Sequence, residues 1–223
     1  MKALTYALFC ILCAIAFAFW PELDIGAARL LADPRQTFQF PLREWSPVAF
    51  LHDYVPFITW AIVAGLLLAA LAWAVPAAAR FRARPVVIAY VALSLAIGPG
   101  LITNGLFKEF SGRARPAQVT EFGGPKQFTA AFTPANQCAT NCSFVSGHAA
   151  TGFYLVTFAL LMTSGLRRRA AIAGAVAAGS LFGLARMAEG GHWLSDVVFS
   201  GLINIAVAWA LHHWLILRRK KTA

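Results

Sequence analysis

Long apolar stretches alternate with short polar or basic segments along almost the whole chain. A helix needs about 20 largely apolar residues to cross a membrane. The stretches that meet or approach this length predict six spans, at roughly 3–20, 55–78, 86–107, 149–165, 170–187 and 194–217, of which the fourth and fifth are short. The pattern therefore predicts an all-α fold, a polytopic six-transmembrane-helix bundle, and we expect residues 1–223 to form a single domain.

The composition also favours a membrane protein. The 223 residues are 59% hydrophobic and only 13% charged, yet the formal net charge is +10. A soluble single domain of this size does not normally combine these values. Topology and contact with anionic lipids explain the basic residues better than nucleic-acid binding does, so no nucleic-acid partner is expected.

The basic residues outside the motifs described below give the expected orientation. With six spans they all fall on one side of the membrane, which the positive-inside rule identifies as the cytoplasm. Both termini are then expected to be cytoplasmic. These residues are Lys2, Arg80, Arg82, Arg84, Arg167–Arg169 and Arg218–Lys221.

The first apolar segment has two interpretations. Its charged start and apolar stretch resemble a signal peptide. However, the bulky Phe19-Trp20-Pro21 does not look like a small-residue cleavage site, and removal of the segment would put the basic loops out of register. We therefore favour an uncleaved first span.

Two loops carry most of the remaining sequence. Residues 21–54 mix acids, bases, prolines and an aliphatic stripe, which predicts a short interfacial helix lying along the membrane surface. Residues 108–147 form a long extracytoplasmic loop, with a turn expected at Gly123-Gly124-Pro125.

The cysteines fall into two groups. Cys10 and Cys13 lie in the first span, where a thiol is usually a small apolar group. Cys138 and Cys142 lie in the extracytoplasmic loop, where an oxidising compartment favours a disulfide. A metal site is the alternative for this spacing, but no second ligand pair lies nearby in the sequence.

The strongest chemical signal lies in the segment LARMAEGGHWLSDVVFSG. On a helix, His192 and Asp196 are neighbours one turn apart. The carboxylate would accept the proton of one imidazole nitrogen and leave the other as a nucleophile or general base. Arg186 precedes this pair by six residues.

Two upstream clusters offer further candidate site residues. One is Lys108 with Arg115-Pro116, and the other is Ser146-Gly147-His148. Taken singly, an arginine at a span end is usually an interfacial anchor, and a serine before a helix is usually a cap. His52, His212 and His213 lack partners of this kind in the sequence and are interpreted as interfacial residues. The role of Glu189 stays open.

In this order, Lys108-x6-Arg115-Pro116, Ser146-Gly147-His148 and Arg186-x5-His192-x3-Asp196 resemble the three-part signature of the type 2 phosphatidic acid phosphatase family, which is shared with vanadium haloperoxidases. The resemblance implies a vanadium-haloperoxidase-like helical core. Val145 and Ala185 depart from the usual proline and serine, but neither position performs the transfer.

The resemblance assigns a role to each candidate, in agreement with the residues read alone. Lys108, Arg115, Ser146, Gly147 and Arg186 would bind the phosphoryl group. His192 would attack phosphorus, oriented by Asp196, and His148 would protonate the leaving alkoxide and later activate water. No metal or other cofactor is expected.

A site at the outer boundary of the membrane favours a phosphate on a lipid of the outer leaflet. The stretches GPGLITNGLFKEFSGRARPAQVTEFGG, QCATNCSFVSGHA and ARMAEGGHWLSDVVFSG are most similar to the bacterial lipid A 4'-phosphatase branch, although that branch can hold an acidic residue at the position of His148. Alternatives are undecaprenyl pyrophosphate, phosphatidylglycerophosphate, or a lipid phosphotransferase that uses the same pocket. The leading hypothesis is a lipid phosphatase of the bacterial inner membrane with a periplasmic active site and with the 4'-phosphate of lipid A as the first choice of substrate.

Overall fold

The structure, a computed structural model, describes residues 3–35 and 39–218. Within these ranges it consists of helices joined by loops, and the only strand-like feature is an isolated bridge between Val119 and Lys126. The prediction of an all-α bundle is confirmed.

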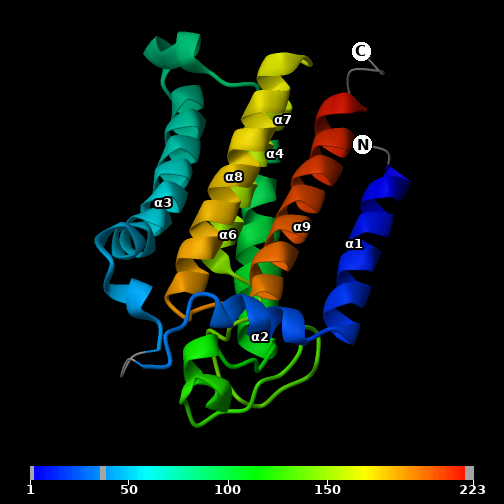
Figure 1. Cartoon of the computed structure of the whole chain (residues 1–223). Helices are drawn as coiled ribbons and strands as arrows, with labels where there is room; N and C mark the ends of the chain where they lie inside the picture. Colours follow the sequence, from blue (N-terminus) through cyan, green and yellow to red (C-terminus); the bar gives the residue numbers. More distant parts are fainter. Residues whose placement is uncertain (1–2, 36–38, 219–223) are drawn as a thin grey trace.

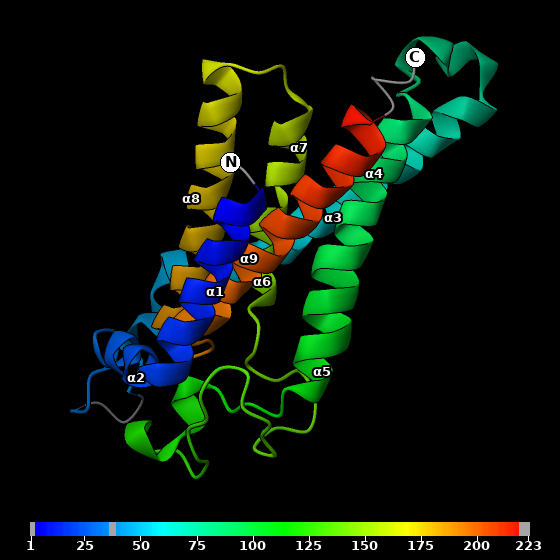
Figure 2. The same cartoon turned by 90° about the vertical axis from the view of Figure 1, so that its right-hand side faces the viewer.

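The bundle is formed by long helical segments that run side by side and alternate in direction (Figures 1 and 2). The third segment is α4 continued by a π-helical part, η3, and by α5, and the last is α9 continued by η6. In chain order the bounds are α1 (Ala3–Phe19), α3 (Ser46–Ala74), α4 (Pro85–Leu95), η3 (Ala96–Phe107), α5 (Lys108–Phe110), α6 (Gly147–Tyr154), α7 (Val156–Leu161), α8 (Leu166–Ala188), α9 (Leu194–Leu211) and η6 (His212–Leu217).

Two facing glycines bring α6 and α8 together. A Cβ atom at Gly152 would lie 2.5 Å from the Cα atom of Gly179, so only glycine allows the two backbones this close approach. The contact holds the helix that follows Ser146 against the helix that ends with Arg186. In this way packing inside the bundle brings the second and third sequence motifs to one place.

Different helices and loops lie at the two ends of the bundle. One end carries the short helices α2 (Glu22–Arg29), η1 (Pro41–Glu44), η4 (Pro116–Gln118) and η5 (Thr120–Phe122), together with the loop before α6 and the connection from α8 to α9 (Figure 1). The opposite end carries η2 (Pro76–Phe81), the α7–α8 connection, the start of α1 and the end of η6. The basic clusters at 80–84 and 167–169 therefore lie opposite the three motifs. Lys2 and residues 219–221, on which the predicted orientation also depends, lie outside the described residues.

Among the described helices, four are long and apolar enough to cross a membrane, or five if α1 and α2 form one broken span bent by 81°. The predicted first and fourth spans are the short ones, with 17 residues in α1 and an apolar helix over Gly147–Leu161. The exact number of six spans therefore stays a prediction.

Two expectations are wrong in detail. The second span begins at Ser46 instead of about 55, because Pro47 fits the first turn of a helix and the helix continues through the polar residues His52 and Asp53. His212, expected at the interface, is buried with its ring 5.7 Å from that of Tyr90.

The predicted interfacial helix exists as α2, directly after α1. Its Asp24 side chain, however, is fully buried. This helix is thus tied to the interior of the protein and does more than cover its surface.

Candidate active site

His192 and Asp196 meet as the sequence predicts, although they do not lie on one helix. His192 lies in the connection between α8 and α9, and Asp196 lies in the first turn of α9. The Nδ1 atom of His192 is 3.3 Å from Oδ2 of Asp196, and both side chains are buried. The same carboxylate oxygen accepts a hydrogen bond from the backbone N–H of Trp193 at 2.9 Å. Nδ1 of His192 is therefore engaged by Asp196, and Nε2 is the ring nitrogen that remains free to act as a nucleophile or a base.

Burial is the main electrostatic influence on His192. Together with the nearby charges of Lys108 and Arg186 it lowers the pKa of His192 to about 3, although the hydrogen bond to Asp196 acts in the opposite direction. The imidazole is consequently neutral near pH 7. A neutral imidazole with one nitrogen fixed by a carboxylate has the form that a nucleophile needs.

Arg113, which the sequence motifs do not include, contacts the other side of Asp196. Its Nη1 atom donates to Oδ1 of Asp196 at 2.6 Å, while the Ser143 hydroxyl donates to Oδ2 at 2.5 Å. The Nη2 atom of Arg113 donates to Asp24 at 2.7 Å. The only sequence signal was the position of Arg113 two residues before Arg115, and nothing local pointed to Asp24.

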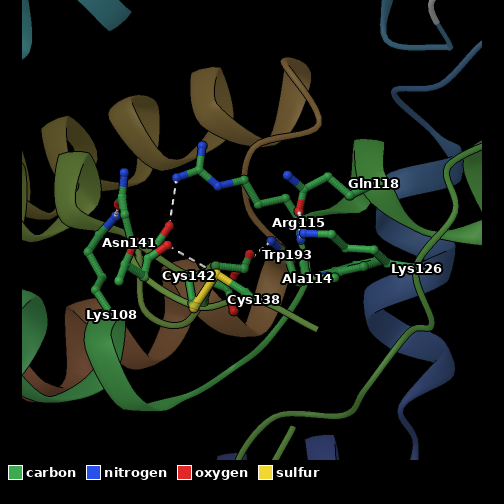
Figure 3. The surroundings of a disulfide bond; sticks show 12 residues. Lys108, Ala114, Arg115, Gln118, Lys126, Cys138, Asn141, Cys142 and Trp193 are labelled. Carbon is green, nitrogen blue, oxygen red and sulfur yellow. Dashed lines mark hydrogen bonds between the residues drawn. A yellow bond between two sulfur atoms is a disulfide. The ribbon is translucent and has the colours of Figure 1, made fainter. Parts of the chain in front are cut away.

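The three candidate phosphate-binding cations are connected through Asn141 and through one cavity. Lys108 Nζ donates to the side-chain oxygen of Asn141 at 2.9 Å, and Arg115 Nη2 donates to the backbone oxygen of the same residue at 3.0 Å (Figure 3). Arg115 and Arg186 both line a cavity of about 250 Å³ that also includes His52 and Glu189. The sequence motifs thus converge, and Asn141 is a contact that the motifs do not reveal.

Asn141 lies in the small loop that Cys138 and Cys142 close. The structure bonds these cysteines, with 5.6 Å between their Cα atoms (Figure 3). The backbone N–H of Cys142 donates to the carbonyl of Lys108 at 2.8 Å, so the loop is held directly against the first residue of α5. Asn141 itself has a φ of 50°, a backbone conformation in which asparagine is favoured over most other residues.

Ser146 and Gly147 begin α6 beside Lys108. The Ser146 hydroxyl caps the helix by accepting from the backbone N–H of Ala149 at 3.4 Å, and the backbone N–H of Ser146 donates to the carbonyl of Asp196 at 3.1 Å. A Cβ atom at Gly147 would lie 3.2 Å from Cε of Lys108, so glycine leaves room for the lysine. This start of a helix, with a cation beside it, suits an anion.

His52 is not an isolated interfacial residue, and that interpretation is wrong. Its backbone oxygen accepts a hydrogen bond from Nε2 of His148 at 3.0 Å, and its Nδ1 atom is 2.9 Å from Oε2 of Glu189. Arg186 Nη1 contacts both Glu189 and His52. His52 makes these contacts because α3 begins early, at Ser46, which places His52 on a helix that reaches the site. Glu189, whose role was open, is a buried partner of Arg186.

Within the described part of the chain, no group of three or more His, Cys, Asp or Glu side chains is placed to hold a metal ion. The independence of the reaction from metals stays a prediction.

Comparisons with known proteins agree with this geometry. A family model described as the PAP2 superfamily matches residues 87–220. The lipid A 4'-phosphatase of Francisella tularensis subsp. novicida (strain U112) is 36% identical over 214 residues, which cover 95% of this chain and 94% of that protein. The lipid A 4'-phosphatase of Rhizobium leguminosarum is 43% identical over 119 residues, 53% of this chain and 50% of that protein. No solved structure gives a significant match.

The chain therefore belongs to the PAP2 superfamily, and it is a phosphatase, a phosphoric monoester hydrolase. The predicted resemblance to the lipid A 4'-phosphatase branch is confirmed. Together with the apolar helices, these relatives indicate a multi-pass protein of a bacterial inner membrane.

Proposed function

We propose that this protein removes the 4'-phosphate from lipid A at the periplasmic face of the inner membrane, with a phosphohistidine intermediate on His192. The main support is the buried His192–Asp196 pair, which leaves Nε2 of His192 free. The charges of Lys108 and Arg186 act on His192, and Arg115 and Arg186 line one cavity. The substrate is taken from the relatives that are lipid A 4'-phosphatases, one of which aligns over 95% of the chain.

In the first step, Nε2 of His192 forms a bond to phosphorus while the bond from phosphorus to the sugar oxygen breaks. Lys108, Arg115 and Arg186 neutralise the phosphoryl oxygens, since phosphoryl transfer depends mainly on positioning and charge. Arg186 has a donor suited to this role, because its Nε atom is buried without a hydrogen-bond partner among the described residues.

His148 supplies the proton that the departing alkoxide takes up. Its Nε2 atom faces the His52 carbonyl oxygen, which can only accept, so Nε2 carries a proton. Nδ1 therefore has a proton to give only when the ring is the doubly protonated imidazolium. Burial lowers the pKa of His148 to about 4, and the negative charge of a bound phosphate acts in the opposite direction and favours the imidazolium. In the second step His148 takes a proton from water, and the resulting hydroxide breaks the bond between phosphorus and His192 to release inorganic phosphate.

The function is tested with purified protein and a panel of phosphorylated lipids assayed side by side. The panel holds lipid A, undecaprenyl pyrophosphate and phosphatidylglycerophosphate, and free phosphate is measured. We expect the highest kcat/KM on lipid A and loss of the 4'-phosphate by mass spectrometry. His192→Ala should remove activity, whereas His213→Ala, at the other end of the bundle, should leave it unchanged. A preference for another lipid would contradict the proposed substrate. Transfer of the phosphate to an acceptor without release of free phosphate would contradict the proposed hydrolysis.

The orientation is tested by labelling a cysteine placed in the long loop. Gln127 is exposed at the end of the bundle that carries the candidate site. A Gln127→Cys variant with Cys138 and Cys142 replaced by serine should react with a membrane-impermeant reagent added to spheroplasts. The parent without Gln127→Cys gives the background from Cys10 and Cys13. Labelling only in inverted vesicles would place the site in the cytoplasm.

A further inference from the structure

A buried row of charges leads away from the candidate nucleophile. Asp196 contacts His192 on one side and Arg113 on the other, and Arg113 continues to Asp24. The side chains of Asp24, Arg113 and Asp196 are at most 2% exposed. The proposed reaction uses only the first member of this row, Asp196, so Arg113 and Asp24 need a separate explanation.

The row is fully hydrogen-bonded. Arg113 donates through Nη1 to Asp196, through Nη2 to Asp24 at 2.7 Å and through Nε to the Thr129 carbonyl at 2.8 Å. Its guanidinium carbon lies 5.4 Å from the centroid of a Trp193 ring, with a further aromatic contact to Phe128. Buried charges are stable only when paired and hydrogen-bonded in this way. The guanidinium is therefore fixed in one orientation toward Asp196.

Asp24 comes from a part of the chain outside the family match. It lies on α2, whereas the match begins at residue 87. Besides Arg113, its carboxylate accepts the backbone N–H of Ser195 at 2.8 Å and the Ser195 hydroxyl at 2.7 Å. Ser195 precedes Asp196 in the first turn of α9. Asp24 therefore fixes the backbone of the helix turn that carries Asp196 as well as the guanidinium that contacts it.

The charges explain why a second carboxylate is useful. An arginine paired with Asp196 alone would form a neutral pair and weaken the attraction of Asp196 for the positive charge that develops on His192. With Asp24 on the far side of Arg113, two carboxylates and one guanidinium leave the row with a net charge of −1. The row then keeps a negative charge beside His192 and holds it in a fixed geometry.

We propose that Asp24 and Arg113 are positioning residues for the His192–Asp196 pair: Arg113 fixes the Asp196 carboxylate, and Asp24 fixes Arg113 and preserves the negative charge that supports phosphoryl transfer to His192. This inference rests on the proposed role of His192 as the nucleophile. It makes the N-terminal segment, through α2, part of the support of the active site.

The test uses the full-length protein in detergent with Asp24→Asn, Arg113→Gln and the double variant. Glu22→Gln and Arg29→Gln are matched controls, because both residues are exposed on α2. The main measurement is the rate constant of phosphoenzyme formation in a single turnover. This rate constant does not depend on how much of each preparation is folded. KM, the pH profile and thermal unfolding are measured beside it.

Asp24→Asn should slow phosphoenzyme formation by about 10- to 100-fold, the range that loss of an outer partner costs for metal-bound histidines, with KM changed by less than about threefold. Arg113→Gln leaves two buried carboxylates without their cation, and it should be slower and less stable than wild type. The double variant again has a net charge of −1 in the row, so it should be faster than Arg113→Gln alone. The acid limb of kcat/KM should move to lower pH in Asp24→Asn and to higher pH in Arg113→Gln.

Three results would overturn the inference. One is an Asp24→Asn rate constant within twofold of the control variants. Another is a loss of thermal stability in all three variants with unchanged single-turnover rates and pH profiles, which is the signature of a purely structural role. The last is a double variant no faster than Arg113→Gln. Activity in His192→Ala would instead contradict the proposed function itself. Failure of this inference and failure of the proposed function can therefore be told apart.

Discussion

Lys108 and Asn141 are joined by a 2.9 Å hydrogen bond although 33 residues separate them in the chain. The backbone oxygen of Asn141 also accepts from Arg115, so one loop residue holds two of the three proposed phosphate-binding cations. The Cys138–Cys142 bridge closes this loop. The loop therefore links the disulfide to phosphate binding.

Asn141→Ala should raise KM by about 2- to 10-fold, which corresponds to the loss of an ordinary hydrogen bond, while kcat changes less. A variant with both Cys138 and Cys142 replaced by serine should show the same direction of change, because the bridge holds Asn141 in place. Asn136→Ala, at an exposed residue just outside the bridged loop, is the control. A digest without reductant should give the bridged peptide two hydrogens below the mass of the dithiol. A fully alkylatable cysteine pair, or an unchanged KM in both variants, would contradict the link between the bridge and phosphate binding.

The pH dependence should reflect a nucleophile that is neutral over a wide range. Burial lowers the pKa of His192 from 6.5 to about 3, so the reactive neutral form is present above that value and is lost only as the pH falls toward it. After correction for the ionisation of the substrate phosphate, measured by phosphorus NMR, kcat/KM should show no acid limb between pH 7 and about 5. An acid limb centred near 6.5 that shifts in Asp196→Asn would show that His192 titrates normally.

His148→Ala should slow the reaction most where the leaving group is poor. We expect a loss of about 100- to 10,000-fold on lipid A, the usual range for removal of a general acid. On an aryl phosphate, whose leaving group needs little protonation, formation of the phosphoenzyme should slow by less than about 10-fold. Equal losses on both substrates in single-turnover measurements would contradict the role of His148 as an acid.

Chelators should leave the rate unchanged, because Lys108, Arg115 and Arg186 already provide the positive charge that a metal would otherwise supply. Orthovanadate should inhibit in competition with substrate, since it takes the five-coordinate geometry of the phosphoryl group under attack by His192. The measurement is phosphate release with EDTA, with EDTA and then magnesium, and with increasing vanadate. Activity lost in EDTA and restored by magnesium would show that the reaction needs a metal.

Local spacing was enough to predict much of this protein. The apolar stretches predicted the helices, because the length of a membrane span is set by the bilayer. The i,i+4 spacing of His192 and Asp196 predicted their contact, although the two residues do not share a helix: His192 lies in the connection just before α9, and the short separation in sequence keeps it beside the first turn that carries Asp196. The order of the three motifs predicted the family, and the family match over residues 87–220 confirms it.

Other relationships were decided only by the tertiary structure. Asp24 lies 171 residues before Ser195 and 89 before Arg113, and no local pattern predicts that they will meet. His52 was misread because hydropathy placed the start of its helix about nine residues too late, outside the reach of Arg186 and His148. Nothing in the sequence distinguishes Asn141 from the other residues between the two cysteines. Spacing along a helix fixes which side chains of that helix share a face. The partners of Asp24, His52 and Asn141 instead depend on how separate helices and loops pack against one another. Short stretches of a single sequence do not contain this information.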